Sequence, residues 1–106
     1  MIARVWSARA ELDRAHLYAA HFTDAVLPRL TALPGCRGAY LLRRVDGDGV
    51  EFVVQTLWDS MDAVSEFAGA TPDLAVVDDE ARAVLTSFDT AVKHYEVLSS
   101  LAGGVE

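Results

Sequence analysis

Apolar and polar positions alternate along several short segments of the chain, which is the pattern of β-strands. In the segment FVVQTLW, residues 52–58, successive side chains of a strand point to opposite faces of the sheet, and both faces are mostly apolar. Residues 2–8, 39–45 and 91–98 also read as strands. The sequence DGDG, residues 46–49, predicts a hairpin turn that leads into the strand 52–58.

The spacing changes to that of a helix after the first strand. From residue 11 to residue 30 apolar side chains recur every three or four positions, which predicts one helix face made of Leu12, Ala15, Ala19, Phe22, Val26 and Leu30. Pro28 lies inside this pattern. Because proline has no backbone N–H, we expect a kink in the last turn or an early end of the regular hydrogen bonding.

Two further helical segments follow the strand 52–58. The sequence MDAVSEFA, residues 61–68, predicts a short helix that Asp59 or Ser60 can cap. The sequence TPD then has the cap, the first-turn proline and the early acid of another helix start, and the apolar pattern continues over residues 71–88. A further cap at Asp78 would split that segment into two parts.

The order strand, helix, strand, strand, helix, strand predicts an α+β, ferredoxin-like fold of the split βαβ type. We expect a four-stranded antiparallel sheet with both helices on one face. The first and third strands are expected side by side and parallel in its middle. The other face carries apolar residues of the strand 52–58, so we expect a second copy of the sheet to cover it in a homodimer. Residues 1–98 are expected to form a single domain, followed by a tail at 99–106.

Composition and charge narrow the choice of partners. Sixteen acidic and nine basic residues give a formal net charge of −7, which argues against binding to nucleic acid or to an anionic membrane. Hydrophobic residues make up 52% of the chain, which favours burial of apolar surface between chains. The single cysteine, Cys36, cannot form an internal disulfide, and the first residues lack a long apolar run. We therefore expect a cytoplasmic protein whose partners are a small molecule and its own second copy.

The expected topology brings several chemically useful side chains to one end of the sheet. If the first and third strands are parallel, Trp6 and Trp58 lie at the same end, near the beginning of the last strand with His94 and Tyr95. Helix N-termini at that end favour an anion, so the arrangement predicts a pocket for an aromatic, acidic ligand. The alternative for each tryptophan is a packing residue of the core or the interface.

His94 is the best candidate for a general base. An unperturbed histidine has a pKa of about 6.5, so it is neutral and able to accept a proton near pH 7. The alternative is a hydrogen-bonded histidine in the dimer interface. His16 and His21 lie five residues apart, off a common helix face, and read as surface or flanking residues. No other histidine or cysteine stands at ligand spacing, so no metal site is expected.

Three stretches of the chain resemble a known family. The run LWDSMDAVSEFAG, with Trp58-x-Ser60 and an aromatic-Ala-Gly helix end, resembles the central motif of the antibiotic biosynthesis monooxygenase domain, within the dimeric α/β-barrel superfamily. The stretches VLPRLTALPGCRGAYLLRR and FDTAVKHYEV are similar to neighbouring parts of that family. The resemblance implies the ferredoxin-like fold, a homodimer and a tryptophan-lined hydrophobic pocket. The superfamily includes cofactor-independent oxygenases of aromatic polyketides, haem-degrading monooxygenases and quinol oxygenases.

The oxygenase branch of the family resembles this chain better than the haem-degrading branch. The latter uses an asparagine on the first strand and a histidine on the second helical region, and this chain has neither. The resemblance implies a monooxygenase that acts with O2, and without cofactor or metal, on a polyketide-, quinol- or anthrone-like aromatic molecule. Trp58, Phe22 and Phe67 would form the aromatic wall, His94 would take the proton, and Trp6 or Tyr95 would orient the ring. The alternatives are a non-catalytic binding or interaction module, a haem-degrading enzyme, and a lyase or cyclase.

Overall fold

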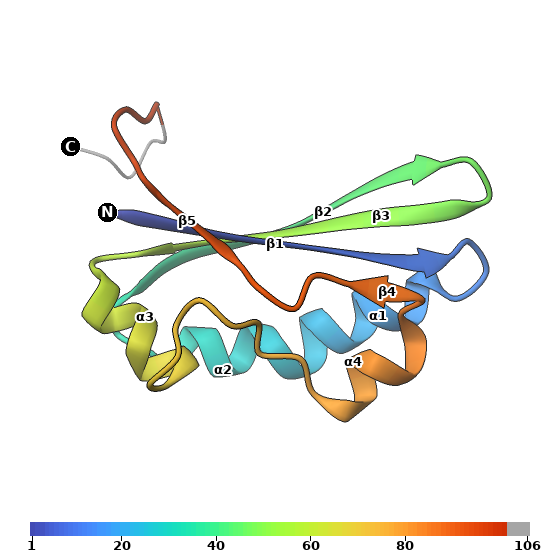
Figure 1. Ribbon diagram of the computed structural model, residues 1–106, viewed down its shortest axis with the longest axis horizontal. Helices are drawn as coiled ribbons and strands as arrows, with labels where there is room; N and C mark the ends of the chain where they lie inside the picture. Colours follow the sequence, from blue (N-terminus) through green and yellow to red (C-terminus); the bar gives the residue numbers. More distant parts are fainter. Residues whose placement is uncertain (102–106) are drawn as a thin grey trace.

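One sheet with helices on a single face makes up the molecule (Figure 1). The computed structural model describes residues 1–101. Its strands are β1 (Ile2–Glu11), β2 (Cys36–Asp46), β3 (Gly49–Trp58), β4 (Ser87–Phe88) and β5 (Lys93–Glu96). All strand pairs are antiparallel, in the order β2, β3, β1, and both β4 and β5 pair with β1. The ferredoxin-like α+β fold is therefore confirmed, with the expected last strand shortened to β5 and a two-residue strand, β4, before it.

The direction of β1 relative to β3 corrects the sequence-based expectation. The two strands are adjacent but antiparallel, with Ile2 opposite Trp58 and Trp6 opposite Val54. The expectation of a parallel pair was wrong because the helical crossover makes β1 parallel to β2, while the hairpin inserts β3 antiparallel between them. The carboxyl ends of β1 and β3 therefore lie at opposite ends of the sheet. Trp6 and Trp58 share a face of the sheet, but Trp58 lies opposite the beginning of β1.

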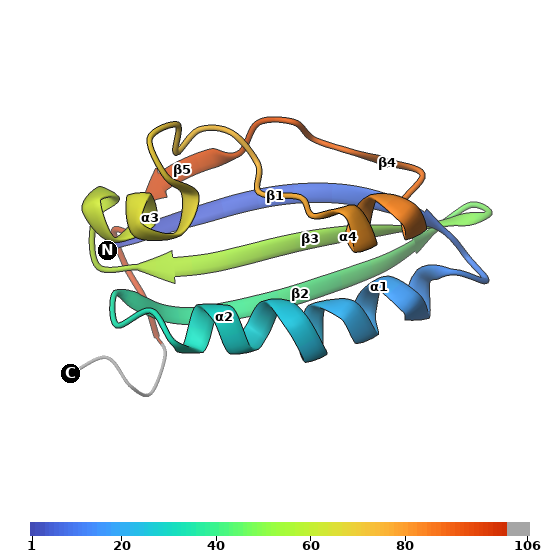
Figure 2. The same cartoon turned by 90° about the horizontal axis from the view of Figure 1, so that it is seen from below.

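The first helical region contains a wide turn. It consists of α1 (Ala15–His21), a π-helical turn (Phe22–Val26) and α2 (Leu27–Thr31), which follow one another along the sheet (Figure 2). The irregular bonding lies directly before Pro28, as the missing N–H of proline led us to expect. Phe22, Val26 and Leu30 are spaced by four residues, which is more than one α-helical turn. The wide turn keeps these three side chains directed at the sheet.

The second helical region is split as its caps suggested. The helix α3 (Met61–Ala68) is capped by Ser60, whose Oγ accepts from the backbone N–H of Ala63 at 3.2 Å. The helix α4 (Asp79–Val84) is capped by Asp78. The helix start expected at residues 71–73 does not form, and residues 70–77, called the strap below, run from α3 to α4 without a helix.

The core lies between the sheet and the helices. It contains two clusters of buried side chains, one around Phe22 and Phe52 and one around Leu30, Trp58 and Val64. Gly35 allows close contact between the turn before β2 and the helix α3, since a Cβ at Gly35 would come within 2.4 Å of the Cβ of Ala63. No helix within residues 1–101 combines the length and apolar character needed to cross a membrane.

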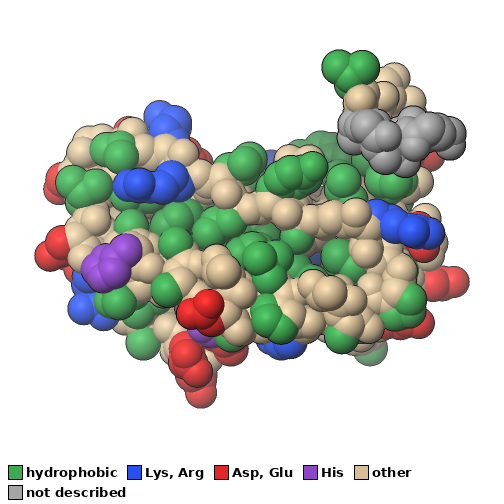
Figure 3. Space-filling view, turned by 180° about the vertical axis from the view of Figure 1, so that it is seen from behind, with side chains coloured by type: hydrophobic (Ala, Val, Ile, Leu, Met, Phe, Trp, Pro, Cys, Tyr) green, Lys and Arg blue, Asp and Glu red, His purple; other side chains and the backbone are tan. Residues whose placement is uncertain are grey.

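The opposite face of the sheet carries large apolar side chains that are half exposed. Tyr40, Leu42 and Tyr95 retain 52%, 47% and 52% of their accessible surface. Figure 3 views the molecule from behind, where the sheet and the helical layer are seen from the side, and shows hydrophobic side chains across the middle with charged side chains mainly around the edge. The homodimer and the cytoplasmic location stay predictions, as does the division into a domain at 1–98 and a tail at 99–106. Residues 102–106 of that tail lie outside the described part of the chain.

Candidate functional site

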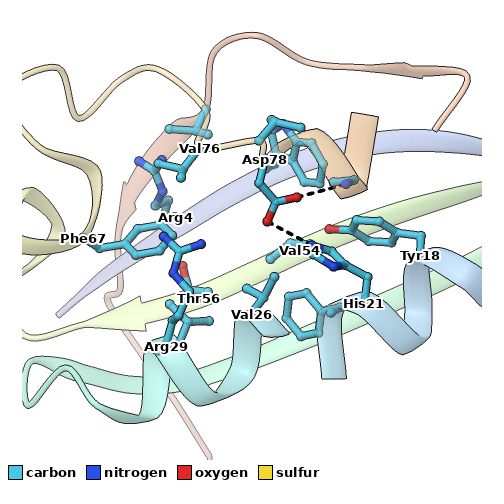
Figure 4. Close-up of a pocket in the computed structure, with 16 residues that line it drawn as sticks. Arg4, Tyr18, His21, Val26, Arg29, Val54, Thr56, Phe67, Val76 and Asp78 are labelled. Atoms are coloured by element: carbon cyan, nitrogen blue, oxygen red, sulfur yellow. Dashed lines mark hydrogen bonds and ion pairs between the residues drawn. The ribbon is translucent and has the colours of Figure 1, made fainter. Parts of the chain in front are cut away.

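A cavity of about 60 Å³ lies between the sheet and the helical layer (Figure 4). It is lined from the sheet, the first helical region, α3, α4 and the strap by Arg4, Trp6, Tyr18, His21, Phe22, Val26, Arg29, Leu30, Val54, Thr56, Phe67, Val76, Val77, Asp78, Ala81 and Val92. The strand pairing explains the sheet side of this lining. Arg4 lies opposite Thr56, and Trp6 lies opposite Val54, so these four side chains point to the same face.

A buried cation stands on the sheet side of the cavity. The side chain of Arg4 donates from Nη1 to the carbonyl oxygen of Pro72 and from Nη2 to that of Leu74, the latter at 3.0 Å. Its Nη1 is also 3.2 Å from Nε2 of His94. Burial lowers the pKa of Arg4, and the negative charge of Asp73 partly opposes this effect. The guanidinium therefore fastens the strap to β1 while it remains part of the cavity wall.

His94 is engaged by Arg4 and is not a free base. Since a guanidinium can only donate, Nε2 of His94 is the acceptor, which leaves the proton on Nδ1, 3.4 Å from Oδ1 of Asp73. Burial and the charge of Arg4 lower the pKa of His94, against a smaller opposing effect of Asp73. His94 is thus held as a neutral ring whose free lone pair points at Arg4.

A second polar group joins α1 to α4 on the cavity wall. Nε2 of His21 lies 3.0 Å from Oδ2 of Asp78, and Nδ1 lies 3.4 Å from a carboxylate oxygen of Glu80. The other oxygen of Asp78 accepts from the N–H of Ala81 at 2.9 Å. The Tyr18 hydroxyl lies near this group (Figure 4), and burial, helped by the charge of Asp78, raises the pKa of Tyr18. Tyr18 therefore stays protonated and can act as a hydrogen-bond donor.

Three of the aromatic residues expected in the pocket line the cavity. Trp6, Phe22 and Phe67 all contribute to its wall. The indole N–H of Trp6 donates to the carbonyl oxygen of Asp89 at 2.7 Å, which fixes the ring orientation. The guanidinium groups of Arg4 and Arg29 both lie against the Phe67 ring, at 5.8 and 5.5 Å from its centre.

Trp58 and Tyr95 lie elsewhere. Trp58 is fully buried, does not line the cavity, and donates from its indole N–H to Oγ of Thr56 at 2.8 Å. Its ring packs 5.7 Å from that of Phe67, so it supports the wall from behind. Tyr95 lies opposite Ala3, on the exposed face of the sheet, and cannot orient a ring in this cavity. The expected contact was wrong because alternation along β5 sends His94 and Tyr95 to opposite faces.

Arg4 and His21 line the cavity but were not among the site residues expected from the sequence. Arg4 could have been found by alternation, because it lies two residues before Trp6 on the same face of β1. His21 was read as a surface residue, but its side chain is only 8% exposed. Its spacing of three residues from Tyr18 places both on the inner face of α1. Within residues 1–101 no group of three or more histidine, cysteine or acidic side chains could hold a metal ion.

Several solved structures share the fold. A crystal structure of a mutant of MhuD with two manganese protoporphyrin IX molecules bound per active site has a TM-score of 0.68 and 21% identity, covering 97% of this chain and 100% of that one. A putative antibiotic biosynthesis monooxygenase from Bacillus cereus has a TM-score of 0.64 and 18% identity, covering 95% and 96% of the two chains. Rv0793 from Mycobacterium tuberculosis has a TM-score of 0.59 and 21% identity, covering 95% and 98%. At these identities the likeness shows the fold alone.

The comparison with family models is more specific. None of the curated proteins matches the chain. The model described as "Antibiotic biosynthesis monooxygenase" matches residues 1–77, which include β1 to β3, α3, and most of the side chains that form the cavity. Because this match covers well over half of the 106 residues, the chain belongs to the antibiotic biosynthesis monooxygenase family.

Proposed function

We propose that this protein is a monooxygenase that oxidises an aromatic small molecule with O2 and without a bound cofactor. The observation that carries this proposal is the cavity between sheet and helices, which has aromatic and aliphatic walls and a buried guanidinium. Such a site suits a flat, electron-rich ring that must become an anion away from water. Membership of the family supports the same reaction type.

The reaction can proceed on the substrate's own electrons. An anthrone- or quinol-like molecule loses a proton to give an electron-rich anion, which passes one electron to O2. The resulting radical pair combines to a hydroperoxide on the same carbon, and loss of water leaves a carbonyl. In total a CH2 group and O2 give C=O and H2O, so one oxygen atom enters the product and both hydrogens leave in water. The protein has to bind the ring, stabilise the anion and exclude water.

The described side chains suit these three tasks. We propose that Trp6, Phe22 and Phe67 bind the ring and that Arg4 stabilises the anion. In our proposal Trp58 supports the ring of Phe67 and does not contact the substrate.

Two histidines lie close enough to the cavity to take part in proton transfer. The base role expected for His94 requires its hydrogen bond from Arg4 to break, and we propose instead that His94 positions Arg4. We propose that the carboxylate of Asp78, held in place by His21, accepts the proton, since neither group contacts Arg4 and both ring nitrogens of His21 already face carboxylates. A matched pair of substitutions, His21→Gln and His94→Gln, tests this assignment. We expect oxygen uptake to fall more in His21→Gln.

A porphyrin fits this site poorly. Both nearby histidines are engaged, His94 with Arg4 and His21 with two carboxylates, so neither offers a free ring nitrogen to a haem iron. The porphyrin bound by the MhuD mutant therefore does not carry over to a haem-degrading role here.

Oxygen uptake is the direct test of the proposed function. The metal-stripped protein is incubated with a panel of anthrones, naphthols and quinols, and 18O2 labelling follows the two oxygen atoms. We expect one labelled atom in the product and the other in water. Val54→Phe, which fills the cavity, should lower the rate, whereas Val45→Phe at an exposed position is the control. Binding without uptake would indicate a binding module, and ring closure or isomerisation without uptake would indicate a cyclase or lyase.

We also propose that the exposed sheet face pairs with a second copy of the chain. Tyr40, Leu42 and Tyr95 present half-exposed apolar surface there. Light scattering after gel filtration should give the mass of a dimer, and Leu42→Glu should shift it to a monomer. Leu12→Glu is the matched control, since Leu12 is equally exposed but lies outside the sheet face. A monomeric mass for the unchanged protein would refute this proposal.

A further inference from the structure

We infer that Arg4 makes the cavity selective for aromatic acids, and that it binds the carboxylate of the substrate directly. This inference rests on the proposed function for the location of the substrate, and it adds the chemical class that the site prefers.

Arg4 is a buried cation without a bonded counter-ion. Its side chain is part of a residue that is only 5% exposed, and no carboxylate of residues 1–101 lies within ion-pair distance of it. The nearest acid by electrostatic effect is Asp73, which is itself largely exposed and contacts His94. A buried charge that lacks a partner is destabilising, so a ligand that supplies the missing negative charge gains affinity here.

The donors of Arg4 are not all used by the protein. Nη1 serves Pro72 and His94, and Nη2 serves Leu74. A guanidinium has five N–H donors, so Nε–H and one N–H of Nη2 have no acceptor among the described residues. Nε and Nη2 form one edge of the guanidinium, and such an edge matches the two oxygens of a carboxylate.

Neighbouring groups add to the preference for an anion. Thr56 lies directly opposite Arg4, and its oxygen already accepts from Trp58, so its own O–H is left to donate. The guanidinium of Arg29 lies against the same Phe67 ring as that of Arg4. The positive charge of two guanidinium groups against this aromatic ring favours an acid bound beside it.

The competing explanation is that Arg4 only fastens the strap. The bonds to the carbonyl groups of Pro72 and Leu74 do this, and they would be present without any ligand. They account for the cation's position but leave its remaining N–H donors without an acceptor. The two explanations differ in a measurable way, because a purely structural arginine gives no preference between a ligand's charged and neutral forms.

Calorimetric binding of salicylate and salicylamide to the full-length protein at pH 7 separates the two explanations. The two probes share the ring and the hydroxyl group and differ in a carboxylate against a neutral amide. Charge-assisted hydrogen bonds exceed neutral ones, so we expect salicylate to bind at least about tenfold more tightly. Equal affinities, or no binding of salicylate, in the unchanged protein would overturn the inference without any variant.

Substitutions then locate the preference. Arg4→Gln should abolish it, and Arg4→Lys, which keeps the charge and the strap contact but loses the planar edge, should reduce it severalfold. Arg9→Gln is the matched control, because Arg9 lies on the same strand but faces the other side, where it pairs with Asp46. If Arg4→Gln fails to fold, Arg4→Lys decides, and an unchanged preference in either variant contradicts the inference.

The outcome can be told apart from failure of the proposed function. If salicylate binds more tightly than salicylamide but no substrate of the panel causes oxygen uptake, the proposed oxygenase activity is refuted and the inferred acid-binding site is supported. If oxygen uptake is equally fast with neutral and acidic substrates of the same ring system, the proposed oxygenase activity is supported and the inferred acid-binding site is refuted.

Discussion

Replacement of Trp58 by phenylalanine separates a packing role from a catalytic one. The side chain is fully buried, its indole N–H bonds to Thr56 at 2.8 Å, and its ring contacts Phe67. Loss of the hydrogen bond removes about 1 kcal/mol. The smaller ring removes about 1–2 kcal/mol more through lost packing. The free energy of unfolding should therefore fall by about 2–3 kcal/mol, and for a domain of this size that lowers the Tm by on the order of 10–20 °C.

The assay combines urea unfolding at fixed protein concentration with oxygen uptake at a temperature where the variant is folded. Because Trp58 does not line the cavity, we expect kcat/KM to stay within about threefold. Thr56→Val and the double variant complete a cycle, in which the coupling free energy should be about 1 kcal/mol. A variant of unchanged stability that lost oxygen uptake would refute this reasoning and make Trp58 a catalytic residue.

Two further predictions concern pH and packing. The pKa of His94 is lowered in the folded state, so near and below the ordinary value of 6.5 the unfolded chain binds more protons than the folded one, and the free energy of unfolding should fall as the pH drops through this range. His94→Gln should flatten this pH dependence in thermal unfolding between pH 7.5 and 5.5. His16→Gln, at an exposed position, should keep it. Gly35→Ala should lower the free energy of unfolding by about 1–3 kcal/mol, because the new methyl group meets Ala63 at 2.4 Å. Gly38→Ala, with its nearest contact at 3.5 Å, is the matched control, and equal effects would contradict the predicted clash.

Local patterns gave most of the fold. The alternation along residues 52–58, the hairpin at DGDG and the periodicity from residue 11 onward each depend on neighbouring residues, and each corresponds to an element of the structure. The cap at Ser60 and the split at Asp78 were equally local signals. The helix start expected at residues 71–73 forms only a turn, closed by the N–H of Leu74 on the carbonyl of Thr71, because distant groups take the next backbone partners: the N–H of Val92 bonds to the carbonyl of Asp73.

The site depended on contacts that no local pattern contains. His21 and Asp78 are 57 residues apart in the chain, and Arg4 and His94 are 90 apart. The aromatic wall could be anticipated, because large apolar side chains on the inner face of a sheet or helix are usually buried in the core. The pairing of Arg4 with Thr56 depends on the direction of β1 relative to β3, which was predicted wrongly. With β1 and β3 correctly antiparallel, Arg4 and Thr56 become direct neighbours.

The wide turn at Phe22–Val26 has a consequence for how relatives of this protein can diverge. It holds one more residue than an α-helical turn would need, and Thr23 and Asp24 within it are exposed. Loss of a single codon there would let the turn close into a regular α-helix with little rotation of the residues after it, because the wide turn spreads its residues over about the rotation that one residue fewer would cover in an α-helix. Val26 and Leu30 would keep their places on the cavity wall, and only the exposed side of the turn would shorten. A one-residue deletion in this turn is thus a change that relatives can undergo without a change in the pocket.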